Sequence, residues 1–103
     1  MIYYVDVDET ICYYEGDRHY PDALPHSERI ARINRLHDAG HTIVYWTARG
    51  AQTGIDWAET TRHQLLKWGA KFHDLKLGKP HFDMYICDKA VNSEVFFNKE
   101  EIK

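Results

Sequence analysis

The sequence has little of what several classes of protein require. It contains only two cysteines, Cys12 and Cys87, and no Cys-x-x-Cys or Cys-x-His spacing, so neither a disulfide framework nor a zinc site is indicated. No apolar run approaches the roughly 20 residues that span a bilayer. The stretch 1–6 is too short and too acidic for a signal peptide. We therefore expect a cytoplasmic protein in a reducing compartment, with no membrane contact.

Positive charge is also scarce. The 16 Asp and Glu residues outnumber the 13 Lys and Arg residues, and the formal net charge is −3. Broad binding to a phosphate backbone needs clustered Lys and Arg, so this balance argues against a nucleic acid partner. A phosphate ligand would have to be bound at a local site, for example through a metal ion.

The chain, 103 residues long, fits one domain, 1–103, because it contains no linker, repeat or low-complexity tract. Runs of apolar, β-forming residues alternate with segments in which apolar residues recur at helical spacing. Gly40 and Gly69 stand where helices commonly end. This pattern predicts strands buried on both faces at 2–5, 42–46 and 84–87, an edge strand at 71–75, and helices at 27–39, 56–68 and 93–101.

A small flap is expected after the first strand. Residues 10–14 and 19–20 flank a turn at 15–18, which is typical of a hairpin. Pro21 and Pro25 should then end any regular structure.

Strands that alternate with helices imply right-handed crossovers and a parallel sheet covered on both sides. The expected fold class is therefore α/β, with a three-layer, Rossmann-like arrangement around a mainly parallel central sheet. Ligands of such sheets bind beyond the carboxyl ends of the strands. Asp6, Thr47 and Asp88 follow the three buried-type runs, so we expect them to meet in one crevice.

Asp6 and Asp8 stand two residues apart, so alternation along a strand would point both side chains the same way. Two like charges repel and raise a pKa unless a cation lies between them. Mg²⁺ is the expected cation, because it binds a few protein oxygens and keeps several waters. Asp88 could supply another ligand, while Lys79 and Thr47 could bind the remaining anionic oxygens. These groups suit phosphoryl transfer.

Four sequence features follow one another along the chain: Asp6-Val7-Asp8-Glu9-Thr10, Thr47, Lys79 and Asp88. Their order resembles that of the four motifs of the haloacid dehalogenase superfamily, and the resemblance covers nearly the whole chain. The stretch 78–90 is similar, more narrowly, to the small capsule-biosynthesis phosphatases, with Cys87 where that family has the first of two adjacent aspartates. The resemblance implies a fold of the haloacid dehalogenase type. No cap domain is expected, since flap, helix and strand use up positions 11–46. Such an open site accepts a bulky substrate or is covered by a neighbouring subunit. Because a second copy of the chain could provide that cover, a homo-oligomer is also expected.

The resemblance also implies roles for these residues. Asp6 would attack phosphorus and form an aspartyl-phosphate, and Asp8 would protonate the leaving oxygen and then activate water. Mg²⁺ would be bound by the carboxylates of Asp6 and Asp88 and by the backbone carbonyl of Asp8. Thr47 would hydrogen-bond the phosphoryl group, and Lys79 would balance its charge. The implied activity is Mg²⁺-dependent hydrolysis of a phosphorylated small molecule, a sugar phosphate or a related polysaccharide-biosynthesis intermediate.

Other residues carry weaker signals. Arg49, two residues after Thr47, could either reach a substrate phosphate or form a structural ion pair. Arg18 and His19 on the flap are candidates for substrate binding. Asp83 is expected to cap or pair locally rather than to bind metal.

Three other functions are open. A phosphatase for nucleotides or polynucleotide ends would use the same site, although the acidic balance counts against a polynucleotide. A signalling receiver domain also uses an acidic cluster, a threonine and a lysine on a doubly wound sheet, but it keeps its phosphoryl group instead of releasing it. The presence of both Asp6 and Asp8 disfavours a binding module without catalytic activity.

Overall fold

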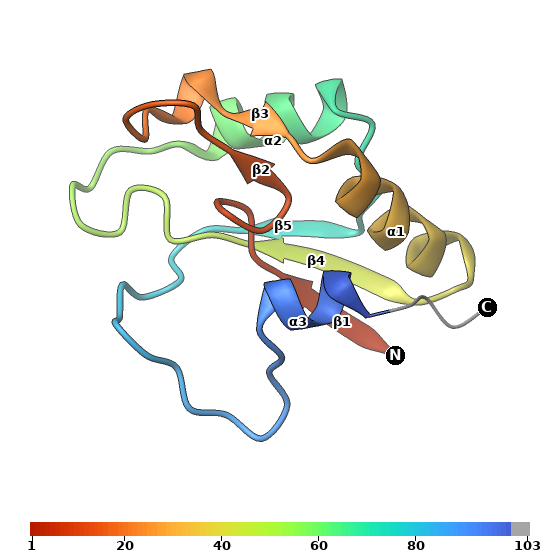
Figure 1. Cartoon of the computed structure of the whole chain (residues 1–103). Helices are drawn as coiled ribbons and strands as arrows, with labels where there is room; N and C mark the ends of the chain where they lie inside the picture. Colours follow the sequence, from red (N-terminus) through yellow and green to blue (C-terminus); the bar gives the residue numbers. More distant parts are fainter. Residues whose placement is uncertain (100–103) are drawn as a thin grey trace.

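The computed structural model describes residues 1–99 (Figure 1). Its parallel sheet contains β1, β4 and β5, in that spatial order, and β2 pairs with β3 in a short antiparallel ribbon. The elements along the chain are β1 (Ile2–Val5), β2 (Cys12–Tyr13), the 3-10 turn η1 (Tyr20–Asp22), β3 (Leu24–Pro25), α1 (Ser27–Asp38), β4 (Thr42–Trp46), α2 (Ala58–Lys67), β5 (Asp74–Lys76) and α3 (Ser93–Asn98). The expected α/β class with a parallel sheet is confirmed.

The register of the sheet aligns the strand ends that matter for the site. Val5, the last residue of β1, lies opposite Tyr45, and Trp46 at the end of β4 lies opposite Lys76. Residues that directly follow β1 and β4 therefore leave the sheet at the same edge, which places Asp6 near Thr47.

Several elements match the predictions made from local signals. The helix predicted over 27–39 is α1, and Gly40 follows it with a φ of 98°, a conformation that favours glycine. The Oδ1 atom of Asp56 accepts the backbone N–H of Ala58 at 2.9 Å, at the start of α2. β4 has the predicted bounds, whereas β5 begins three residues after the predicted start of the edge strand and ends one residue beyond its predicted end. α3 falls within the predicted terminal helix, whose last residues, 100 and 101, lie outside the described residues.

The predicted strand at 84–87 is wrong. These residues lie in the loop between β5 and α3, where Met84 and Ile86 are 78% and 90% exposed. α3 is held on α1 by an ion pair of 2.9 Å between Arg29 and Glu94 and by Arg32 stacked 4.5 Å from the Phe96 ring centroid. The chain thus reaches α3 through an exposed loop instead of entering the sheet. Apolar composition alone provides no pairing partner.

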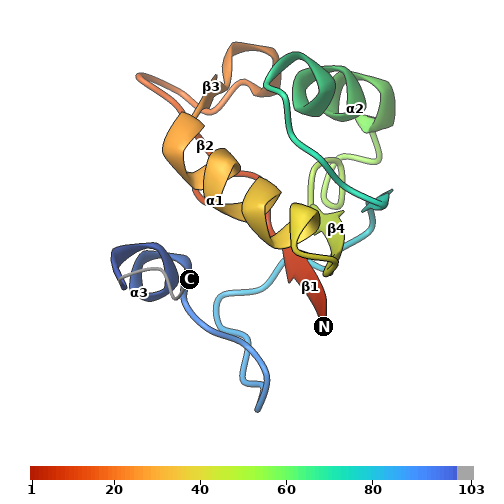
Figure 2. The ribbon, with the colours of Figure 1, turned by 90° about the vertical axis from the view of Figure 1, so that its right-hand side faces the viewer.

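The prediction that β1 is buried on both faces is also wrong. The order β1-β4-β5 follows the order along the chain, and crossovers of one hand then place successive helices on the same side of a sheet. Figures 1 and 2 show α1 and α2 on one side. Ile2 and Tyr4 point to the other side and are 68% and 52% exposed. The expected third layer does not cover them.

The core lies between the sheet and the two helices on that covered side. Apolar residues of α1, β4, α2 and β5 meet there, together with the turn that follows β1. Its largest fully buried apolar side chains are those of Val7, Ile11, Cys12, Ile33, Ile43, Tyr45 and Leu65. None of the described helices combines the length and apolarity that crossing a membrane requires.

The predicted flap is present but pairs differently. Cys12 and Tyr13 lie opposite Pro25 and Leu24, not opposite 19–20. Pro25 therefore belongs to a strand, which a two-residue ribbon tolerates because proline loses a hydrogen bond only on the side of its missing N–H. Pro21 lies in η1, where its fixed φ suits a helical turn.

Candidate active site

A pocket of about 550 Å³ lies beyond the carboxyl ends of β1 and β4. Most of the predicted site residues line it, although they come from the end of β1, the flap, the loop after β4 and the loop after β5. Those residues are Asp6, Asp8, Arg18, His19, Thr47, Arg49 and Lys79. Asp88 is not among the lining residues. Together with Cys87 it lies in the exposed loop before α3, where the Cys87 Sγ atom accepts the backbone N–H of Lys89 at 3.4 Å.

Asp6 directly follows β1 and forms an ion pair with Lys79. The Lys79 Nζ atom lies 3.6 Å from Asp6 Oδ1. The backbone of Lys79 is fixed too, because its N–H donates to the Thr47 carbonyl at 3.2 Å. Burial raises the pKa of Asp6, and the charge of Lys79 offsets this only in part. The site therefore holds one carboxylate that is both charge-paired and open to the pocket.

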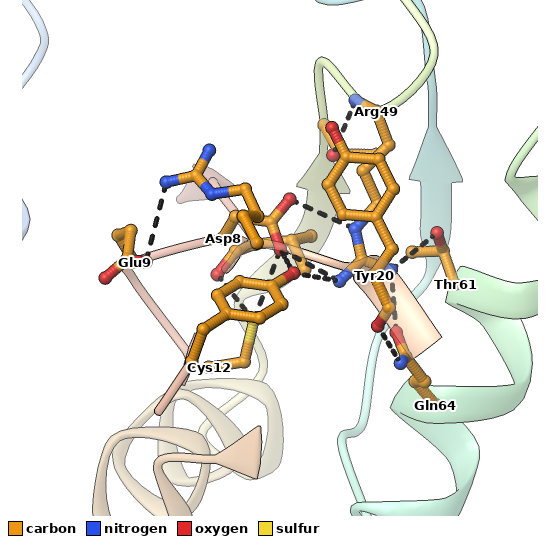
Figure 3. A network of polar contacts seen from close by, with 11 residues as sticks. Asp8, Glu9, Cys12, Tyr20, Arg49, Thr61 and Gln64 are labelled. Carbon is orange, nitrogen blue, oxygen red and sulfur yellow. Dashed lines mark hydrogen bonds and ion pairs between the residues drawn. The ribbon is translucent and has the colours of Figure 1, made fainter. Parts of the chain in front are cut away.

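Asp8 has a different environment, shown in Figure 3. Arg49 forms a bidentate contact with the Asp8 carboxylate: Nε donates to Oδ2 at 3.0 Å, and Nη2 donates to Oδ1 at 2.9 Å. Tyr14 and Cys12 also donate to Oδ1. Burial alone would raise the pKa of Asp8, but the hydrogen bonds and charge of Arg49, together with Tyr14, lower it.

The turn after Asp8 is tight and contains an unusual backbone conformation. Glu9 has a φ of 61°, in the left-handed region that few residues other than glycine adopt. The backbone N–H groups of Thr10 and Ile11 both donate to the Val7 carbonyl, which closes the turn. The Glu9 side chain reaches Arg18 on the flap at 3.5 Å. The turn thereby connects the carboxylate pair with the flap.

Thr47 directly follows β4 and is almost completely buried. Its Oγ1 atom accepts the backbone N–H of Arg49 at 3.1 Å. A hydroxyl that accepts one hydrogen bond still has its own proton to donate, so Thr47 keeps a donor for an anionic oxygen.

The loop after Arg49 depends on a glycine. Gly50 has a φ of 83°, and a Cβ atom at this position would lie 2.1 Å from the carbonyl oxygen of Ile55. No other residue type allows the loop to fold back so closely. The folded loop brings Gln52, Thr53 and Trp57 to the pocket wall.

Sequence reasoning missed several residues that shape the site. Tyr14, Thr61 and Gln64 contact the Asp8–Arg49 pair, and Trp57, His81 and Phe82 line the pocket. The available signal was weak: Thr61 and Gln64 are polar residues at helical spacing among apolar ones. Of the two alternatives for Arg49, the structure shows the ion pair, because its guanidinium contacts the Asp8 carboxylate.

The donor set does not complete the expected Mg²⁺ site. Asp88, one of the two expected carboxylate ligands, does not line the pocket, which leaves Asp6 as the expected carboxylate in place. Across residues 1–99, no group of three or more His, Cys, Asp or Glu side chains could hold a metal ion. If the ion binds, the Asp6 carboxylate would hold it, together with the Asp8 carbonyl that the resemblance implies as a second ligand.

Comparisons with known proteins bear on the fold of the chain and provide no information on its activity. No protein-family model matches the chain, and no curated protein matches it. A crystal structure of a structural-genomics target from Vibrio cholerae is similar, with a TM-score of 0.84 and 26% sequence identity over 96% of this chain and 89% of that chain. The chain therefore shares its overall fold with a second protein.

Proposed function

We propose that the protein is a phosphomonoester hydrolase of the haloacid dehalogenase type, with Asp6 as the nucleophile. The observation that carries the proposal is the ion pair of 3.6 Å between Asp6 and Lys79, in a pocket that Asp8 and Thr47 also line. A carboxylate next to a fixed ammonium group and a hydroxyl donor suits attack on a phosphoryl group, whose oxygens need positive charge and hydrogen bonds.

The first step transfers the phosphoryl group to the protein. An oxygen of Asp6 forms a bond to phosphorus while the bond from phosphorus to the ester oxygen breaks. The electron pair of that bond stays on the leaving oxygen, which takes a proton from Asp8. The negative phosphoryl group favours the protonated form of Asp8, against the effect of Arg49.

The second step releases phosphate. Asp8, now ionised and held by Arg49, takes a proton from water as the water oxygen bonds to phosphorus. The bond between phosphorus and Asp6 breaks, and the carboxylate returns to its pair with Lys79. Inorganic phosphate leaves, and Asp8 carries the proton needed for another cycle.

The proposed substrate is a sugar phosphate or a related polysaccharide-biosynthesis intermediate. The pocket offers aromatic surface from Trp57 and Phe82 beside polar groups such as Gln52 and Arg18, a mixture that suits a ligand with both apolar and hydroxyl-bearing faces. A nucleobase could stack on the same rings, so nucleotides are the second candidate class.

The test is a screen of phosphorylated sugars and nucleotides for release of inorganic phosphate. It is run with Mg²⁺ and with a chelator, because the resemblance implies that the ion is required. We expect release from at least one sugar phosphate by the wild-type protein and none by Asp6→Asn, whose amide is a poor nucleophile. Asp83→Asn is the matched control, because Asp83 is exposed and does not line the pocket. Undiminished release by Asp6→Asn would end the proposal.

A further inference from the structure

Arg49 is an unusual residue for a pocket, because its charge is buried. The residue is 2% exposed, and its guanidinium has an acceptor for every N–H. Nε and Nη2 each donate a hydrogen bond to the Asp8 carboxylate, and Nη2 also lies 3.4 Å from the Tyr14 hydroxyl oxygen. Nη1 donates to Thr61 Oγ1 at 3.0 Å and to Gln64 Oε1 at 2.6 Å. The side chain therefore has no free donor for a substrate phosphate.

The far end of the guanidinium is anchored to α2. Thr61 and Gln64 belong to that helix and are themselves buried. Gln64 also donates through Nε2 to the Tyr20 carbonyl at 2.6 Å, and the Tyr20 ring lies 4.7 Å from the Arg49 guanidinium carbon. Figure 3 shows these groups converging on the guanidinium from α2 and from η1. Arg49 thus connects the carboxylate of Asp8 with α2 and, through Gln64, with η1.

We propose that Arg49 is a positioning residue, which fixes the plane and position of the Asp8 carboxylate for proton transfer, and not a substrate-binding residue. The inference rests on the proposed function, in which Asp8 moves a proton. A guanidinium that binds both carboxylate oxygens fixes the plane of the carboxylate, which a single hydrogen bond would leave free to rotate. Misplacement of a reacting group by about 1 Å can cost on the order of 100-fold in rate.

The experiment compares kcat and KM for phosphate release by the wild-type protein, Arg49→Ala and Arg49→Lys. We expect kcat of Arg49→Ala to fall about 100-fold while KM stays within about twofold, because transition-state positioning is lost and substrate binding is not. Arg49→Lys should recover little of the lost kcat, since an ammonium group cannot form the bidentate contact with the Asp8 carboxylate. A rise in KM with kcat unchanged would assign Arg49 to substrate binding and overturn the proposal.

A double-mutant cycle with Asp8→Asn separates positioning from a general structural effect. If Arg49 acts through Asp8, Arg49→Ala should reduce kcat by far less in the Asp8→Asn background than in the wild type. Additive losses would contradict the proposal. Added guanidinium ion, well below denaturing concentration, should restore part of kcat to Arg49→Ala and none to the double variant. Arg62→Ala, which removes an exposed arginine of α2, is the matched control and should need no rescue.

Removal of Arg49 leaves Asp8 buried without its partner, and Arg49→Ala could fail to fold. Gln64→Leu and Thr61→Val then provide the test, because each removes one anchor and keeps the ion pair. We expect each to lower kcat several-fold with KM unchanged, and unchanged kcat in both folded variants would overturn the proposal. Absence of activity in the wild-type protein would instead refute the proposed function, so the two failures are distinguishable.

Discussion

Asp6 and Asp8 are the same residue type, two positions apart, yet the fold shifts their pKa values in opposite directions. Asp6 is paired with one ammonium group at 3.6 Å, and burial prevails, so its pKa is raised. Asp8 accepts a two-pronged contact from Arg49 and a hydrogen bond from Tyr14, which lower its pKa. In the free protein these shifts oppose the first proposed step, which uses an ionised Asp6 and a protonated Asp8. The negative phosphoryl group of a bound substrate therefore has to raise the pKa of Asp8.

The raised pKa of Asp6 predicts a cost in stability. A carboxyl group with a higher pKa in the folded state stabilises the fold below the unfolded-state pKa, and this contribution is lost as pH rises through the folded-state pKa. At pH 7 the folded protein therefore holds an unfavourable ionised group. Asp6→Asn should raise the Tm at pH 7, and the gain should shrink near pH 3, where the carboxyl is protonated in both states.

Differential scanning calorimetry at the two pH values measures this effect, with Asp83→Asn as an exposed control that should leave the Tm unchanged at both. A lower Tm for Asp6→Asn at pH 7 would mean that the pair with Lys79 outweighs burial.

At the scale of elements, the sequence predicts what local signals determine. The bounds of α1 and β4 follow from apolar spacing, a run of β-formers and the glycine at position 40. Pairing is not local, which is why the flap strands and the run at 84–87 were predicted wrongly. The Asp8–Arg49 contact joins residues 41 positions apart, and no periodicity or motif specifies it.

The loop after β4 offers a test of one local requirement. Gly50 and Gly54 both have positive φ, but a Cβ atom would meet the Ile55 carbonyl only at Gly50, while Gly54 faces open space. Gly54→Ala should cost about 1 kcal/mol through its backbone conformation, and Gly50→Ala about 2 kcal/mol more through the added overlap. Urea unfolding of the two variants measures the difference, and equal losses would show that the loop yields to the new methyl group at little cost.

At the scale of the whole molecule, the parallel sheet and its crevice were predictable, and the layering was not. Residues after β1 and β4 meet at one edge because parallel strands share a direction, and that rule needs only the order of elements. Whether helices cover one face of the sheet or both depends on the position at which the last strand joins the sheet. With no strand at 84–87, the described helices α1 and α2 cover one face and Ile2 remains exposed.

Two isoleucines on neighbouring strands test this layering. Ile43 of β4 is fully buried, whereas Ile2 of β1 is 68% exposed. Ile43→Ala should lower the free energy of unfolding by about 2–5 kcal/mol, and Ile2→Ala by no more than about 0.5 kcal/mol. Chemical denaturation provides both values. A comparable loss for Ile2→Ala would indicate that another layer covers that face of the sheet.

The central claim, that Asp6 carries the phosphoryl group, is tested most directly by mass spectrometry of the acid-quenched protein during turnover of a substrate found in the screen. The account predicts a mass increase of one phosphoryl group on the peptide that contains Asp6. With an aryl phosphate as substrate, whose leaving group needs no general acid, the adduct should accumulate in Asp8→Asn, where the attacking water lacks its base. It should be absent in Asp6→Asn. Release of phosphate with no adduct in any variant, or an adduct on a different residue, would contradict it.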